Sequence, residues 1–172
     1  PMDFKYFCNY RNLLRSFLKC DDIIMPKSKE TLDIVIHIRL DDILGYHQDY
    51  SLMPFSFYKH AISNIKKHHG PLNDKKIVII GRPIDDFQNK IFRDIHEYIS
   101  KQTKNDNMKL QSGSITEDIL AIMHSKILIA SIGSFWFWPS FLSFTNDEIH
   151  VPIFGQNKVY HYRQICISYS FI

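Results

Sequence analysis

Short apolar runs alternate along this chain with longer segments in which apolar residues recur every three or four positions. The runs are rich in Ile and Val, which is typical of buried strands, and the periodic segments are typical of helices with one buried face. The predicted strands span residues 32–39, 75–81, 108–111, 126–130 and 148–152. The predicted helices span residues 54–69, 87–101, 114–124 and 135–142.

This alternation predicts an α/β fold, a Rossmann-like, doubly wound parallel sheet with helices on both faces. We expect a single domain over residues 31–172, preceded by an N-terminal helix and connector in residues 1–30. The N-terminal helix is expected over residues 10–19. Residues 159–169 are aromatic and poorly periodic, so they form either a further strand or a segment packed on the core.

The composition is that of a folded protein, with 172 residues, 45% hydrophobic and 23% charged. A net charge of +3 is too small to indicate a nucleic-acid partner. Three scattered cysteines favour neither a zinc site nor a disulfide framework, so we expect a reducing, cytoplasmic location. No apolar run reaches the length of a membrane span. The first residue is Pro1, which leaves open that the chain is part of a longer protein.

The first predicted strand ends in four polar residues, His37, Arg39, Asp41 and Asp42. Alternate residues of a strand share a face, so the first three would point the same way. In open α/β sheets, ligands bind at the carboxyl ends of the strands. Because a guanidinium can pair with two oxygens of a phosphate, Arg39 predicts a phosphate site. The alternative is that Arg39 and Asp42 only pair with each other.

A second candidate site is the turn of small residues that runs from Ser131 through Gly133 and Ser134 to Phe135. It lies between a predicted strand and a predicted helix, where backbone N–H groups can face an anion. The alternative is a plain strand-to-helix turn. The aromatic residues 135–138 are expected mainly in the core. No spacing of histidines and carboxylates indicates a metal site, so no metal is expected.

Three motifs, in order, resemble those of the fucosyltransferase superfamily, which includes α-1,2-, α-1,6- and protein O-fucosyltransferases. The run His-Ile-Arg-Leu-Asp-Asp at residues 37–42 resembles that superfamily's His-x-Arg-x-x-Asp motif. Residues 54–58, Pro-Phe-Ser-Phe-Tyr, are similar to a Pro-x-x-Tyr-Tyr segment. Residues 118–138 are similar to its downstream motif, an acid opening a helix, then a strand, then Ser-Phe-x-Trp. The resemblance covers roughly residues 30–155.

This resemblance implies a GT-B glycosyltransferase that inverts the anomeric centre without a metal or a cofactor. Its donor would be a nucleotide sugar of the GDP-fucose type, with other donors such as those of rhamnose or xylose left open, and its acceptor a glycan hydroxyl. GT-B enzymes have two Rossmann-like domains, and the C-terminal one binds the donor. This chain resembles that donor domain, so acceptor binding would need an additional domain or chain.

The resemblance also implies residue roles. Arg39 would bind the β-phosphate of the donor, and His37 would line the same pocket. Asp118 would meet the base, while Ser134 and the Phe135 backbone would hold phosphate oxygens, with Ser131 opening that turn.

The general base is open among Asp41, Asp42, His47 and Asp49, with Asp41 or Asp42 favoured. The family often has Arg-Gly after its first arginine, where this chain has Leu-Asp at residues 40–41, so a second arginine is missing. Two other interpretations stay open. One is a non-catalytic module that binds nucleotide sugars, and the other is a plain α/β interaction domain.

Overall fold

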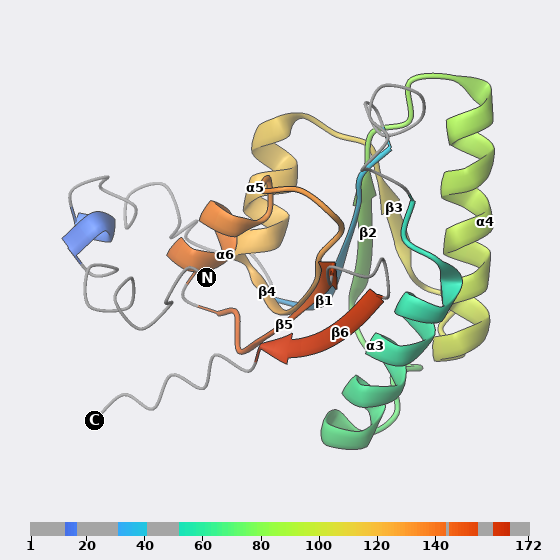
Figure 1. Cartoon of the computed structure of the whole chain (residues 1–172), viewed down its shortest axis with the longest axis horizontal. Helices are drawn as coiled ribbons and strands as arrows, with labels where there is room; N and C mark the ends of the chain where they lie inside the picture. The colour runs from blue at the N-terminus through green and yellow to red at the C-terminus, as the bar shows by residue number, and fades with distance from the viewer. Residues whose placement is uncertain (1–12, 17–30, 41–51, 144, 155–159, 166–172) are drawn as a thin grey trace.

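The computed structural model describes residues 13–16, 31–40, 52–143, 145–154 and 160–165. In this part of the chain a Rossmann-like α/β fold is built on six strands in the order β3-β2-β1-β4-β5-β6 (Figure 1). The first five strands run parallel, and β6 pairs antiparallel with β5. The strands are β1 (Leu32–Ile38), β2 (Ile77–Gly81), β3 (Lys109–Gln111), β4 (Ser125–Ile129), β5 (Glu148–Phe154) and β6 (Tyr160–Ile165).

Helices lie on both faces of the sheet, as the alternation of elements predicts (Figure 1). Two long helices, α3 and α4, cover one face, and the shorter α5 and α6 cover the other. Their bounds are α3 (Phe55–His69), α4 (Asp86–Thr103), α5 (Ile115–Met123) and α6 (Phe137–Leu142). Of the N-terminal helix expected over residues 10–19, residues 13–16 are helical and the others lie outside the described residues.

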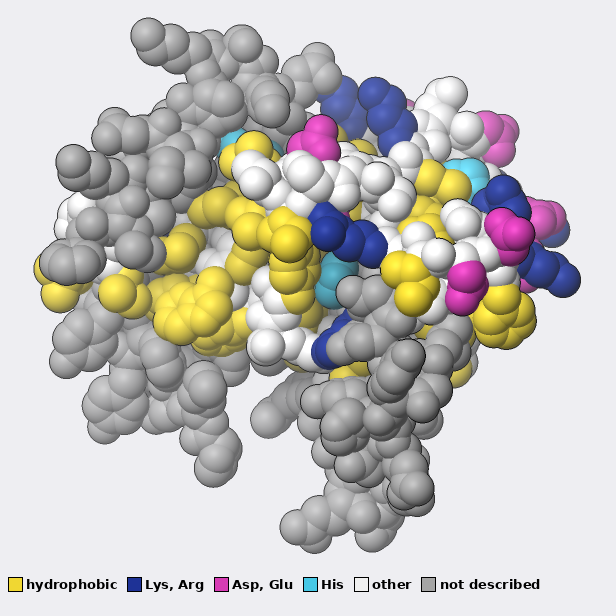
Figure 2. All heavy atoms as spheres, turned by 90° about the horizontal axis from the view of Figure 1, so that it is seen from above, with side chains coloured by type: hydrophobic (Ala, Val, Ile, Leu, Met, Phe, Trp, Pro, Cys, Tyr) yellow, Lys and Arg dark blue, Asp and Glu magenta, His cyan; other side chains and the backbone are white. Residues whose placement is uncertain are grey.

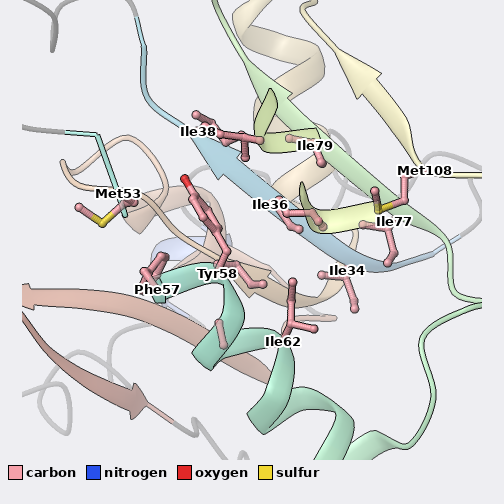
Figure 3. Packing of buried hydrophobic residues seen from close by; sticks show 14 of the residues in the cluster. Ile34, Ile36, Ile38, Met53, Phe57, Tyr58, Ile62, Ile77, Ile79 and Met108 are labelled. Atoms are coloured by element: carbon pink, nitrogen blue, oxygen red, sulfur yellow. The ribbon is translucent and has the colours of Figure 1, made fainter. Parts of the chain in front are cut away.

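The central strand β1 shows why both faces are covered. Successive side chains of a strand point to opposite faces. Ile34, Ile36 and Ile38 therefore pack with residues of α3 and α4 (Figure 3), while Val35 packs in the cluster on the α5 side. His37 shares the face of Val35, so its ring points toward the α5 and α6 layer at the carboxyl end of the strand.

The helix ends follow local sequence signals. Ser114 caps α5 in a reciprocal capping box with Glu117. Helix α3 ends at Gly70, whose φ of 78° is costly for other residues. The sequence also predicts a helix from residue 135, and this start is wrong, because α6 begins at Phe137 and the two residues before it form a turn.

The boundaries of the five predicted strands agree with those of the structure to within two residues at every end. The segment at residues 159–169, left open by the sequence, contains the antiparallel edge strand β6. No helix among the described residues is long and apolar enough to cross a membrane.

Candidate functional site

The strand order creates a crevice at the centre of the sheet. From β1 the chain moves outward to β2 and β3, and it then returns to β4, beside β1, before moving to β5 on the other side. The point between β1 and β4 is therefore a topological switch point, where ligands of open α/β sheets bind outside the carboxyl ends. The two candidate sites expected from the sequence follow β1 and β4, so the fold brings them together.

Arg39 lies directly after β1, and its side chain reaches the turn after β4. A Cβ atom placed on Gly133 would overlap the Arg39 Nη1 atom, so the guanidinium lies against the backbone of this glycine. Gly133 has a φ of 107°, a conformation that other residues rarely adopt. The turn after β4 therefore needs glycine for two reasons, its backbone conformation and the closeness of Arg39.

His37, near the end of β1, contacts the turn that follows β4. Its Nδ1 atom lies 2.9 Å from the Ser131 hydroxyl, and its ring lies 5.3 Å from the Phe135 ring, centroid to centroid. Burial, and then the positive charge of Arg39, lower the pKa of His37 to about 4. His37 is thus neutral at pH 7, and it orders the turn without adding charge.

A cavity of about 410 Å³ opens at this point, and we call it the switch-point cavity. Its volume is within the usual range for sites that bind small molecules. It is lined by residues of β1, β2, α5 and the turn after β4: His37, Ile38, Arg39, Leu40, Gly81, Arg82, Ile115, Asp118, Ser134 and Phe135. Figure 2 looks down on this end of the molecule and shows basic and histidine side chains close together near its middle, with hydrophobic side chains beside them.

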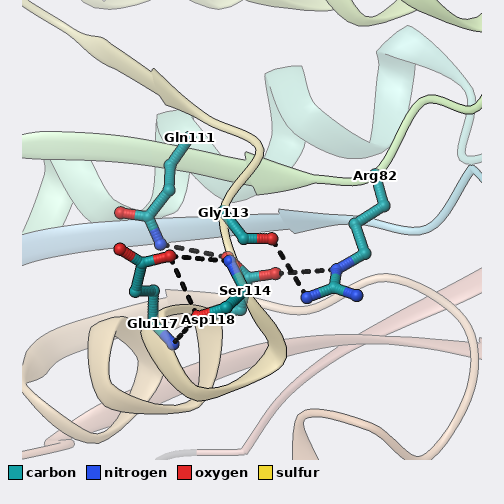
Figure 4. Close-up of polar contacts among 6 residues, drawn as sticks. All are labelled: Arg82, Gln111, Gly113, Ser114, Glu117 and Asp118. Carbon is teal, nitrogen blue, oxygen red and sulfur yellow. Dashed lines mark hydrogen bonds and ion pairs between the residues drawn. The ribbon is translucent and has the colours of Figure 1, made fainter.

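A second guanidinium lines the cavity from β2. Arg82 Nε donates to an Asp118 carboxylate oxygen at 3.4 Å, and Arg82 Nη2 donates to the Gly113 carbonyl at 3.1 Å (Figure 4). The other Asp118 oxygen accepts from Gln111 Nε2 at 3.0 Å. Asp118 is buried in the first turn of α5, and together with the Gly113 carbonyl it orients Arg82 at the cavity wall.

The sequence analysis missed Arg82, although a signal was present. It follows the buried strand β2 directly, as Arg39 follows β1, and the carboxyl ends of neighbouring parallel strands meet at one edge. Gly81 lets the ends of β1 and β2 and the Phe92 ring pack closely, because a Cβ at this position would lie 3.0 Å from the Ile38 carbonyl oxygen and 2.9 Å from the Phe92 ring. The cavity therefore has a second arginine, which directly follows β2.

The structure places most of the expected site residues around the switch-point cavity. His37, Arg39, Asp118, Ser134 and Phe135 line it, whereas Ser131 is buried beneath it against His37. The candidate general bases Asp41 and Asp42, with His47 and Asp49, lie outside the described residues.

Each carboxylate oxygen of Asp118 accepts one hydrogen bond from the protein, and the side chain also lines the cavity. Helix α6 is short and begins three residues after Ser134, so the turn itself, and not the helix end, faces the cavity. The aromatic residues 135–138 were expected mainly in the core, and this is wrong, because Phe135 and Trp138 are exposed and Trp136 and Phe137 are only partly buried.

The cavity has an excess of positive charge. Its lining side chains include two guanidiniums, of Arg39 and Arg82, and one carboxylate, of Asp118. Within the described ranges, no group of three or more His, Cys, Asp or Glu side chains is arranged to hold a metal ion. The arrangement is suited to an anionic ligand with an uncharged part that lies along Ile115 and Phe135. Comparison of the chain with family models, with curated proteins and with solved structures found no match.

Proposed function

We propose that the switch-point cavity binds the diphosphate of a nucleotide sugar, and that this chain is the donor-binding domain of a glycosyltransferase. The reaction would be metal-independent, inverting transfer of a sugar from a GDP-linked donor of the fucose type to a glycan hydroxyl. The observation that carries the proposal is the position of Arg39. Its guanidinium lies against the Gly133 turn at the switch point, and it lines a cavity of the right size.

Arg39 supplies the chemistry that such a reaction needs. The acceptor oxygen attacks the anomeric carbon, the bond from that carbon to the β-phosphate oxygen breaks, and the acceptor proton goes to a base. Negative charge grows on the departing diphosphate. A fixed guanidinium stabilises this charge more strongly in the transition state than in the ground state, which is what accelerates transfer.

The turn after β4 would complete the phosphate site. Ser134 lines the cavity and can donate its hydroxyl proton to a phosphate oxygen, and the Phe135 backbone is adjacent. His37 stays neutral and sets the position of this turn through Ser131 and Phe135. The base that takes the acceptor proton is proposed to be Asp41 or Asp42. The additional acceptor-binding domain or chain, and the cytoplasmic location, are proposals of the same kind.

The experiment is to measure donor hydrolysis and sugar transfer with GDP-linked sugars, for the natural chain and for Arg39→Ala. We expect kcat/KM to fall about 100-fold in the variant, because both ground-state binding and charge stabilisation are lost. Arg93→Ala is the matched control, because Arg93 is an exposed arginine of α4 that does not line the cavity. Activity should persist in a chelator, and a strict requirement for a divalent cation would contradict the metal-free mechanism.

A second candidate is a module that binds nucleotide sugars without transferring them. Asp118, the only carboxylate among the described residues that line the cavity, has both oxygens engaged by protein donors. It is therefore a poor general base. Because transfer to a glycan would need the additional domain or chain, donor hydrolysis is the readout that separates the two, and GDP-linked sugars that bind without being hydrolysed would favour this second function.

A further inference from the structure

Arg82 uses only part of its hydrogen-bonding capacity within the protein. A guanidinium has five N–H donors. Arg82 donates one from Nε to Asp118 and one from Nη2 to the Gly113 carbonyl. These two donors lie on one edge of the guanidinium plane. In Figure 4 the third nitrogen points away from both partners and has no contact drawn to it.

The remaining edge of Arg82 therefore offers a pair of parallel donors, from Nη1 and the second N–H of Nη2. Among the described residues, no hydrogen-bond acceptor is paired with this edge, and Arg82 lines the switch-point cavity with about a third of its side chain exposed. Its orientation is fixed, because its partner Asp118 is buried and is itself held by Gln111. A fixed pair of donors recognises two neighbouring acceptors of a ligand.

The surroundings of Arg82 differ from a phosphate site. The ion pair with Asp118 leaves no net charge on this side of the cavity, so the donors are suited to neutral acceptors. Ile115 also lines the cavity, and its side chain is 55% exposed at the start of α5. Two donors beside an exposed apolar side chain match the edge and the face of a nucleobase.

We propose that Arg82 is the residue that selects the base, by donating two hydrogen bonds to O6 and N7 of guanine while Asp118 positions it. Guanine presents two neighbouring acceptors on this edge, and an arginine fork matches them. Adenine presents a donor and an acceptor there, so its amino group meets a donor of Arg82. This inference rests on the proposed function, because it assigns the base of the same nucleotide.

The assignment differs from one in which Asp118 reads the base. A carboxylate would accept hydrogen bonds from N1 and the 2-amino group of guanine, which lie on another edge. Here each oxygen of Asp118 accepts one hydrogen bond, from Arg82 and from Gln111, so we assign it the role of holding Arg82. Asp118 is therefore a positioning residue, and the two edges of guanine can be distinguished by altering the ligand.

The test is calorimetric titration of the full chain with GDP, ADP, UDP, CDP, inosine diphosphate and 7-deazaguanosine diphosphate. We expect GDP to bind about tenfold or more tightly than ADP. Inosine diphosphate keeps O6 and N7 and should bind like GDP. The 7-deaza compound lacks the N7 acceptor and should bind several-fold more weakly. Equal binding of GDP and the 7-deaza compound, or tighter binding of CDP than of GDP, would overturn the assignment.

Variants test the same point from the protein side. Arg82→Lys keeps the charge but loses the fork, so it should weaken GDP about tenfold and leave ADP almost unchanged. Asp118→Asn should also reduce the preference for GDP over ADP, since it loosens the hold on Arg82. Arg93→Lys is the matched control, and thermal melts report whether each variant is folded.

The possible failures separate the two proposals. Arg82→Lys could weaken all the diphosphates equally, and this would show that Arg82 serves the phosphates or the fold, and not the base. The base assignment would then be wrong while the donor site remained. If no nucleoside diphosphate bound the natural chain, the proposed function itself would fail, and the assignment of the base would fail with it.

Discussion

The two ends of the parallel strands carry similar polar residues but use them differently. At the amino end these residues pair with one another. The Asn146 amide donates to the Ile122 carbonyl and the Ser125 hydroxyl at 3.0 and 2.8 Å, and Glu148 lies within 2.8 Å of both His69 and His150. At the carboxyl end, Arg39 and Arg82 line the switch-point cavity.

The difference shows that a buried or half-buried polar group indicates function only where it faces a space that a ligand can fill. Pairs at the amino end should contribute to stability alone, because they do not line the switch-point cavity. The cations at the carboxyl end should contribute to binding more than to stability. The substitutions below test this division, from the largest expected effect to the smallest.

Asn146→Ala should lower the free energy of unfolding by about 3 kcal/mol, because it removes the buried hydrogen bonds that the amide group donates to Ile122 and Ser125 and leaves a void. Chemical denaturation of the variant measures this loss. Its affinity for GDP, measured well below the melting temperature, should be that of the natural chain. A large loss of affinity in a folded Asn146→Ala protein would contradict the division between the two ends.

Gly133→Ala should reduce the affinity for GDP by about 100-fold, because its Cβ would occupy the position of the Arg39 guanidinium. Titration calorimetry measures this effect. Gly70→Ala is the matched control, since Gly70 also has a positive φ but a Cβ there would meet nothing within 4 Å. Both variants should lose about 1 kcal/mol of stability from backbone strain, and only Gly133→Ala should lose affinity.

His37 should make stability depend on pH below about 6.5. Burial, and then the charge of Arg39, lower the pKa of His37 to about 4, so the unfolded state binds more protons between these values. The stabilising contribution is complete above pH 6.5 and is lost as the pH falls toward 4, by roughly 2 kcal/mol at pH 4.5. Denaturation curves from pH 7.5 to 4.5 measure it. His37→Gln should show a smaller decrease over this range, and an identical decrease in both proteins would count against the assignment.

Lys126→Ala should have the smallest effect. Lys126 Nζ lies 3.1 Å from an Asp33 carboxylate oxygen at the amino end, and the lysine side chain is about half exposed. Exposed pairs of this kind contribute less than about 1 kcal/mol, and salt screens them. The backbone N–H of Lys76 still donates to Asp33 in this variant. Denaturation in low and high salt measures the effect, and a loss well above 1 kcal/mol would show that this end depends on the pair.

Local patterns in the sequence predict most of this fold. The buried strands β1, β2 and β4 are continuous apolar runs, and α3, α4 and α5 have clear periodicity and start or stop signals. The start of α6 was predicted two residues too early, because aromatic residues continue through the turn before it. The order of the strands depends on packing between distant segments, and no local pattern specifies it.

The residues of the site were predictable where a local pattern marks them. The position of Arg39 after a buried strand was enough to expect it at the carboxyl edge, and the small residues around Gly133 identified the turn. Arg82 follows the same rule but belongs to none of the three motifs, so it was not predicted as a site residue. The engagement of Asp118 by Arg82 and Gln111 joins three separate elements, and only the folded chain brings them together.

The central claim is that Arg39 binds a diphosphate in the switch-point cavity. The most direct measurement is calorimetric titration of GDP into the natural chain and into Arg39→Lys, with melting temperatures recorded for both. The account predicts one bound GDP per chain and an affinity about tenfold lower in the variant, because lysine lacks the planar fork. An unchanged affinity in a folded Arg39→Lys protein would contradict it.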